Sequence, residues 1–327
     1  MKIENLLVST LFVTLLNLGA VIADAAPVRG DFEVEITAID DEGKNVENAD
    51  IGFSWGQIYG KEPDSGSERK LSNHQGEASF SGKTVFGDFA FGGVKTGYYP
   101  NRAMRGSFEK IVEGEWRPSP QNLTVVLKRV RNPVPMYAKE INLVLPGEGE
   151  RLAFDLVEGD WVAPFGKGKE RDVEFCFEGQ YQSKINYDGT VTLRFLGDGS
   201  GLLPYDYDQS SNSELKMPYE APISGYIPTW SWRNARMTSS EKFARSTFID
   251  DMKIPRGYIF RVRAVVDSEG KVVSAMYGKI QGRFFFQVFE GNKGGIGFTY
   301  YLNPDRSRNL EFDPKRNLFP GERVVEP

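Results

Sequence analysis

The chain has 327 residues, of which 40% are hydrophobic and 13% aromatic, so it can fill more than one core and is not a globally disordered protein. Its formal net charge of −5 is scattered along the sequence and gives no electrostatic case for nucleic-acid binding, so we expect no nucleic-acid partner. With one cysteine, Cys176, and one histidine, His74, the chain cannot form an internal disulfide or most zinc sites, and we expect neither a metal nor a cofactor.

The N-terminus has the form of a secretory signal peptide. Lys2 precedes an apolar run over residues 6–23, and the small residues Ala23-Asp24-Ala25 follow. This pattern predicts a signal peptide over residues 1–25, with cleavage after Ala25. The alternative is an uncleaved membrane anchor, because the run is close to spanning length. We expect a secreted or periplasmic protein with no membrane span after cleavage.

Residues 30–131 alternate apolar and polar side chains, which is typical of strands with one buried face. We expect strands over residues 31–39, 46–55 and 123–127, and a turn at residues 40–44. Two more strands lie within residues 73–100, and residues 65–70 are expected to form a polar loop. The residues expected to point inward in these strands are Phe32, Val34, Ile36, Ala38, Ala49, Ile51, Phe53, Trp55, Ala78, Phe80, Phe89 and Phe91.

This region resembles the carboxypeptidase-regulatory-like domain, a transthyretin-like (prealbumin-like) β-sandwich. The resemblance implies a seven-stranded accessory module with no active site of its own, and its spacing departs from the family pattern between residues 99 and 121. The residues that carry it are Val34, Ile36, Ala38, Asp40, Gly43, Val46, Ala49, Gly76, Phe80, Gly87, Phe89, Phe91, Gly97 and Tyr98.

A second β-rich unit of unknown function is predicted over residues 136–327, after the stiff connector Asn132-Pro133-Val134-Pro135. Its expected strands cover residues 174–177, 184–187 and 190–195, with Asp188-Gly189 as the hairpin turn. An antiparallel meander follows at residues 260–266, 273–277, 284–289 and 296–302. From Asn303 onward the polar, proline-punctuated chain is expected to wrap the surface.

One amphipathic helix is predicted between these strands. Thr238-Ser239-Ser240-Glu241 has the form of a capping box, and Pro255 would end the helix. Its apolar face would consist of Phe243, Ala244, Thr247, Phe248 and Met252. The fold class is therefore all-β: an N-terminal transthyretin-like sandwich, then a larger, mainly antiparallel β domain with one helix.

The candidate ligand-binding residues are Trp230, Trp232, Arg233 and Arg236. In an extended strand the two tryptophan rings face one side, and with the arginines they could stack a sugar ring or grip a protein partner. The alternative, which the abundance of structural aromatics favours, is that the tryptophans fill the core of the second domain.

A polysaccharide hydrolase is the rival interpretation, because such chemistry needs only two suitably spaced carboxylates. The candidates are Asp198, Asp206, Asp250 and Glu220, and no pair stands out. A faint calcium-loop pattern at Asp206, Asp208, Ser210 and Asn212 lacks the required glycine and final carboxylate, which favours a solvated loop. We therefore expect an exported, non-catalytic protein with a binding or structural role, whose partner is a glycan or an envelope protein.

Overall fold

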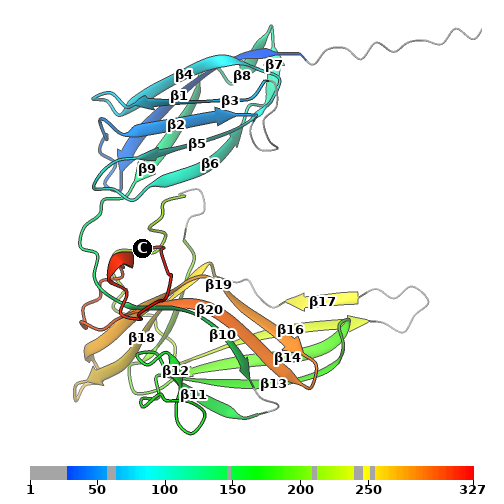
Figure 1. Ribbon diagram of the computed structural model, residues 1–327, viewed down its shortest axis with the longest axis vertical. Coiled ribbons are helices and arrows are strands. Elements are labelled where there is room, and N and C mark those ends of the chain that lie inside the picture. The colour runs from blue at the N-terminus through cyan, green and yellow to red at the C-terminus, as the bar shows by residue number, and fades with distance from the viewer. Residues whose placement is uncertain (1–27, 57–63, 146–148, 208–211, 239–245, 251–254) are drawn as a thin grey trace, which may run out of the picture.

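A computed structural model describes residues 28–56, 64–145, 149–207, 212–238, 246–250 and 255–327 (Figure 1). These residues form twenty strands in four sheets, and the helical structure among them is one 3-10 turn, Pro314–Arg316. The protein is all-β, as the alternating pattern predicts. None of the described segments forms a helix with the length and hydropathy to span a bilayer. The predicted signal peptide, residues 1–25, lies outside the described residues.

The N-terminal module consists of two sheets with one core between them (Figure 1). In the first sheet, β1 pairs antiparallel with β4 and parallel with β9, and β8 and β7 extend it. The second sheet has the order β3-β2-β5-β6. The strands are β1 (Gly30–Asp40), β2 (Asp50–Trp55), β3 (Gly66–Leu71), β4 (Glu77–Thr84), β5 (Asp88–Val94), β6 (Asn101–Ser107), β7 (Lys110–Val112), β8 (Glu115–Arg117) and β9 (Gln121–Leu127).

Alternation along the strands places the expected side chains in this core. In β1, Phe32, Val34, Ile36 and Ala38 are buried while the residues between them face outward. The expected turn after β1 is also present, with Gly43 at a φ of 80°, where a glycine carries no steric cost. The other expected inward residues are likewise buried or packed against the core.

Residues 65–70 do not form the predicted loop. Residues 66–70 belong to β3, which pairs with β2 along its whole length at the edge of the sheet. The sequence suggested a loop because neither face of β3 is deeply buried, so its polar residues follow no hydrophobic alternation.

The C-terminal module is a second pair of sheets, with orders β10-β20-β19-β18-β15 and β12-β11-β13-β14-β16-β17. Its core is separate from that of the N-terminal module and consists of residues between Ile141 and Leu302. The strands are β10 (Tyr137–Leu145), β11 (Arg151–Asp155), β12 (Asp160–Trp161), β13 (Val173–Ser183), β14 (Asn186–Phe195), β15 (Gly201–Tyr205), β16 (Thr229–Thr238), β17 (Ser246–Asp250), β18 (Gly257–Val266), β19 (Val272–Phe289) and β20 (Lys293–Asn303).

The first hairpin of this module turns at a different place from the predicted one. Asp188 and Gly189 lie within β14, opposite Gln180 and Gly179, and the chain reverses between Ser183 and Asn186. Gly189 is needed in the strand for packing, because a Cβ there would lie 2.6 Å from the Val288 side chain. Its role is thus close approach rather than turn formation.

The predicted helix is wrong. Residues 246–250 form β17, which pairs antiparallel with residues 234–238 of β16. Thr247, Phe248 and Ile249 are residue types that favour strands, and the free edge of β16 offers them backbone partners. The helical spacing was therefore overridden by sheet pairing. The capping residues Ser239–Glu241, and Phe243, Ala244 and Met252, lie outside the described residues.

The C-terminal segment, residues 304–327, returns to the place where the two modules meet (Figure 1). Phe312 pairs with Val134 of the connector in an isolated bridge, and both pack with Met136 and Tyr301. The expectation that this segment wraps the surface is therefore incomplete, because Leu310, Glu311 and Phe312 are buried.

Candidate functional site

The two tryptophans of the predicted ligand site lie on the inward face of β16. Trp232 is buried, stacks on Phe284 with ring centroids 4.2 Å apart, and donates its indole N–H to the hydroxyl of Tyr258 at 3.2 Å. Trp230 is partly buried and packs against the same core. Both rings share one face, as their spacing predicts, and that face is the interior of the C-terminal module.

The two arginines do not join the tryptophans. Arg233 points to the opposite face of the sheet, where it binds both carboxylate oxygens of Asp188 at 2.8 and 2.9 Å. This hydrogen bonding lowers the pKa of Asp188. Arg236 is partly exposed farther along β16, opposite Tyr187. The structure therefore does not bring the four predicted residues together.

A polar cavity of about 580 Å³ lies on the outward face of the same sheet. Side chains from β11, β13 and β14 line it, with the loop after β14 at one end. Its charged lining consists of Arg151, Glu174, Glu178, Arg194 and Asp198, and Cys176 and Thr192 also contribute.

A hydrolase would be favoured by two carboxylates facing each other in a cleft lined by Trp230 or Trp232, and this cavity does not have that arrangement. Neither tryptophan lines it, and the Glu174 carboxylate is already held by the Arg171 guanidinium. Burial, aided by the charge of Glu178, raises the pKa of the Cys176 thiol, which disfavours the nucleophilic thiolate. The arrangement is that of a polar sheet face, on which Glu174 of β13 lies opposite Arg194 of β14.

The other candidate carboxylates are dispersed. Glu220 pairs with Arg308 at 2.7 Å near the junction of the modules, whereas Asp206 is exposed and lies 3.7 Å from Arg256. The side chain of Asp250 lies outside the described residues, as do Asp208 and Ser210 of the calcium-like pattern. Among the described residues, no three carboxylate, histidine or cysteine side chains are grouped so that they could hold a metal ion.

A buried polar site lies at the junction between the modules, at Glu311. Its carboxylate accepts hydrogen bonds from the Tyr99 hydroxyl at 2.8 Å and from the backbone N–H groups of Arg131 and Asn132 at 2.8 and 2.7 Å. Glu311 is 1% exposed, so these bonds are shielded from water. Burial and the bond to Glu311 raise the pKa of Tyr99, which keeps its proton available for donation.

A second set of contacts reinforces the junction. The segment at residues 212–217 runs beside β6: Arg102 N–H donates to the Asn212 carbonyl at 3.3 Å, and Glu214 N–H donates to the Pro100 carbonyl at 2.9 Å. The Lys128 ammonium donates to the Leu215 carbonyl at 2.7 Å. The guanidinium of Arg131 lies 4.0 Å from the ring centre of Tyr219. Together these contacts tie the edge of the N-terminal module to loops of the C-terminal one.

Sequence reasoning missed Glu311 because no local pattern distinguishes it. It stands in the polar tail about 180 residues after its partners Arg131 and Asn132. The one available signal is its position between Leu310 and Phe312, two apolar residues in an otherwise polar stretch.

Comparison with known proteins gives only distant likenesses. No family model and no curated protein matches the chain. The shaft pilin spaA from Lactobacillus rhamnosus GG is 13% identical with a TM-score of 0.21, over 52% of this chain and 90% of that chain. BcpA, the major pilin subunit of Bacillus cereus, is 11% identical with a TM-score of 0.23, over 86% and 99%. A Streptococcal ancillary pilin is 10% identical with a TM-score of 0.23, over 68% and 60%. Likeness at this level assigns neither a function nor a partner.

Proposed function

We propose that the protein is an exported, non-catalytic structural protein that holds two β-sandwich modules in a fixed relative orientation. The observation that carries this proposal is the Glu311 carboxylate, which binds the N-terminal module and the connector with three shielded hydrogen bonds. Charge-assisted bonds of this kind are stronger than neutral ones. Export is supported by the predicted signal peptide over residues 1–25.

The N-terminal module is proposed to be a carboxypeptidase-regulatory-like sandwich in an accessory role. The proposal is supported by the positions of the residues that carry the resemblance. Of these, Val34, Ile36, Ala38, Phe80 and Phe89 are buried in the core, and the turn glycines Gly43, Gly76 and Gly97 have positive φ angles.

A protein partner is favoured over a glycan. Aromatic recognition of a sugar requires an accessible ring face, whereas Trp232 is buried and Trp230 packs against the core. A rigid scaffold of two modules, by contrast, presents large strand faces to other proteins at a constant spacing.

Replacement of Glu311 tests the fixed orientation. In Glu311→Gln, one carboxylate oxygen becomes an NH2 group that cannot accept from a backbone N–H, so at least one of the bonds to residues 131 and 132 is lost. We expect double electron–electron resonance between spin labels on the two modules to give a narrow distance distribution in wild type and a broad one in this variant.

The matched control is Glu220→Gln, which removes an exposed carboxylate paired with Arg308 in the same region. It should leave the distribution narrow, because an exposed pair contributes little. Near-ultraviolet circular dichroism of each variant verifies that both modules remain folded. A wild-type distribution as broad as that of Glu311→Gln would refute the proposed scaffold role.

A further inference from the structure

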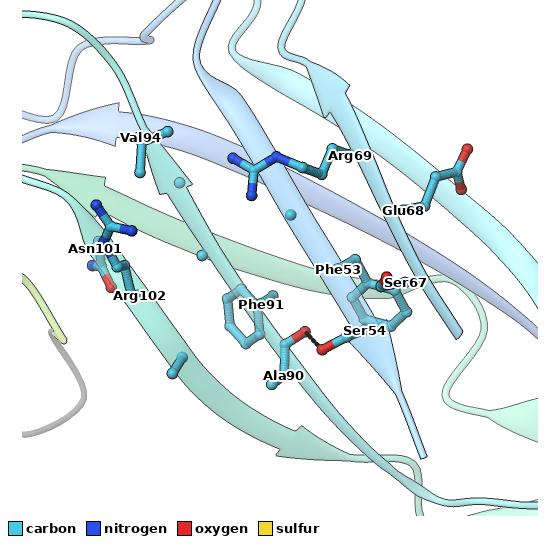
Figure 2. A pocket seen from close by; sticks show the side chains of 14 residues that line it. Phe53, Ser54, Ser67, Glu68, Arg69, Ala90, Phe91, Val94, Asn101 and Arg102 are labelled. Atoms are coloured by element: carbon cyan, nitrogen blue, oxygen red, sulfur yellow. Dashed lines mark hydrogen bonds between the residues drawn. The ribbon is translucent and has the colours of Figure 1, made fainter. Parts of the chain in front are cut away.

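The pocket on the outward face of sheet β3-β2-β5-β6 carries charged side chains that already have partners (Figure 2). Arg102 lies 3.4 Å from the Glu214 carboxylate, and Arg69 is likewise paired with a carboxylate. The Ser54 hydroxyl donates to the Ala90 carbonyl at 3.3 Å, a bond that Figure 2 shows as a dashed line. Because these groups are satisfied, the pocket does not point to a ligand.

Two polar groups on one face of β19 have no such partner. Lys279 is fully buried, and its Nζ atom makes no hydrogen bond to any described residue. This amino group lies 4.9 Å from the ring centre of Tyr301. Gln281 is 6% exposed, and its Oε1 atom is also without a partner among the described residues. Side chains two apart in a strand share a face, so both groups lie under the same cover.

This cover includes residues 322–327, which we call the strap (at the red end of the ribbon in Figure 1). The Gln281 side-chain amide donates to the Glu326 carboxylate at 2.7 Å. Val324 packs against the apolar cluster that contains Tyr301. The strap therefore lies over the ring beside which the buried amino group is placed.

The strap is held mainly by side chains. Within the described part of the chain, residues 323–327 form no backbone–backbone hydrogen bond. Lys216 lies 3.9 Å from the Glu326 carboxylate, whose side chain is 56% exposed, so this ion pair contributes little. Lys279, by contrast, is fixed in the backbone ladders that β19 forms with β18 and β20. The strap is therefore the neighbour of Lys279 that moves at the lowest cost.

The charges around Lys279 do not compensate for its burial. Glu311 and Glu326 favour the charged amine, but neither accepts a hydrogen bond from it, and Lys128 disfavours it. Tyr301 stays neutral, because burial raises its pKa. Burial therefore lowers the pKa of Lys279 to about 7, whereas a lysine in water keeps its proton up to about pH 10.5.

We propose that residues 322–327 leave the sheet when Lys279 takes up a proton and return when the proton is lost. An ammonium ion has three N–H donors, and water satisfies all of them once the strap has opened. Opening also hydrates the Oε1 atom of Gln281. Proton uptake and opening are linked, so the ratio of open to closed molecules rises as the pH falls from about 10 to about 7 and is constant below about pH 6. The surface that the C-terminal module presents therefore differs between alkaline and neutral surroundings.

Methyl-TROSY NMR of the protein labelled with ¹³C-methyl valine measures the two states. In the closed state the Val324 methyl groups pack against the cluster that contains Tyr301 and Phe312, whose rings shift their resonances. In the open state these methyl groups have random-coil resonances. We expect the open-to-closed ratio to rise at least tenfold from about pH 9 to about pH 7 and to level off below about pH 6. Val273, 61% exposed on the same strand, should keep its resonances.

Variants at position 279 test whether this group is the sensor. Lys279→Met and Lys279→Gln remove the titrating amine, so each should show the same Val324 resonances at every pH. Lys271→Met, at an exposed position, should titrate like wild type. The one histidine, His74, lies in the N-terminal module and cannot cause this titration. Wild-type resonances that do not change with pH, or a pH dependence that survives in both Lys279 variants, would overturn the inference. Glu311 lies outside the strap and is unchanged in every variant, so the scaffold role is judged separately.

Discussion

Lys279 places an amino group in the interior of the C-terminal module, on the face of β19 that the C-terminal segment covers. The residue is fully buried, and its Nζ atom has no hydrogen-bond partner among the described residues. The amino group lies 4.9 Å from the ring centre of Tyr301 on β20. Burial, aided by the positive charge of Lys128, lowers the pKa of Lys279 to about 7. The negative charges of Glu311 and Glu326 act in the opposite direction but do not offset this shift.

This lowered pKa makes stability depend on pH. The unfolded chain keeps the Lys279 proton up to about pH 10.5, whereas the folded chain releases it near pH 7. Between these values the unfolded state binds more protons, so the free energy of unfolding rises with pH. Below about pH 7 both states are protonated and the full cost of the buried charge is present.

We predict that Lys279→Met raises the free energy of unfolding by about 2 kcal/mol at pH 6, because a methionine of similar length removes an uncompensated charge. The variant should also show a smaller rise in stability between pH 7 and 10. Urea unfolding of the C-terminal module, followed at several pH values, measures both effects. Lys271→Met, at an exposed position, serves as the control. Equal pH slopes in wild type and Lys279→Met would contradict the assignment.

At the scale of strands, β19 illustrates why glycine positions matter. It runs for 18 residues and pairs with both β18 and β20. Gly278 lies where the neighbours come closest: a Cβ there would be 2.3 Å from the Phe260 ring and 2.4 Å from the Tyr301 carbonyl oxygen. Because one of these atoms belongs to the backbone, the strands themselves would have to separate.

We predict that Gly278→Ala destabilises the C-terminal module by about 3 kcal/mol, at the upper end of overpacking costs. Gly52→Ala is the matched control in β2, where no atom is closer than 3.5 Å. It should stabilise its module by about 0.5 kcal/mol, since an alanine loses less entropy in a strand. Amide hydrogen exchange resolves the two modules separately. If Gly278→Ala and Gly52→Ala lost similar amounts of amide protection, the close contacts at position 278 would not be the reason that a glycine is needed there.

The strands were predictable where burial alternates and unpredictable where pairing decides. Phe32 to Ala38 and Phe89 to Phe91 alternate in the sequence, and they are strands. Residues 246–250 carry helical spacing, yet a free sheet edge draws them into β17. Glu311 could not be predicted, because its partners are set by how two modules meet rather than by any neighbour in sequence.

On the scale of the whole molecule, two separate cores are joined by a polar junction. Tyr99 and Lys128 of the N-terminal module donate to Glu311 and to the Leu215 carbonyl across it. The core of the N-terminal module lies wholly between Phe32 and Leu127. Each module can therefore bury its own apolar surface, and the junction contributes orientation in addition to stability.

We predict that residues 28–131 alone fold cooperatively but unfold at lower urea concentration than the same module in the full chain. The loss should be about 5 kcal/mol, because the fragment gives up five hydrogen bonds that residues 99–131 make across the junction, each with a net value of about 1 kcal/mol. Circular dichroism and amide exchange of the isolated module make the measurement. A fragment without cooperative unfolding would show that its core is incomplete without the second module.

The Glu311 junction also sets an order of events in time. Residues 309–317 follow the strands of both modules in the chain, so synthesis from the N-terminus makes every strand before the segment that carries Glu311. Until then the connector at residues 132–135 joins the modules without the hydrogen bonds to Glu311. A fixed relative orientation is then the last property that the molecule acquires, and a chain that stops before residue 309 would keep its twenty strands but lose the Glu311 bonds between the modules.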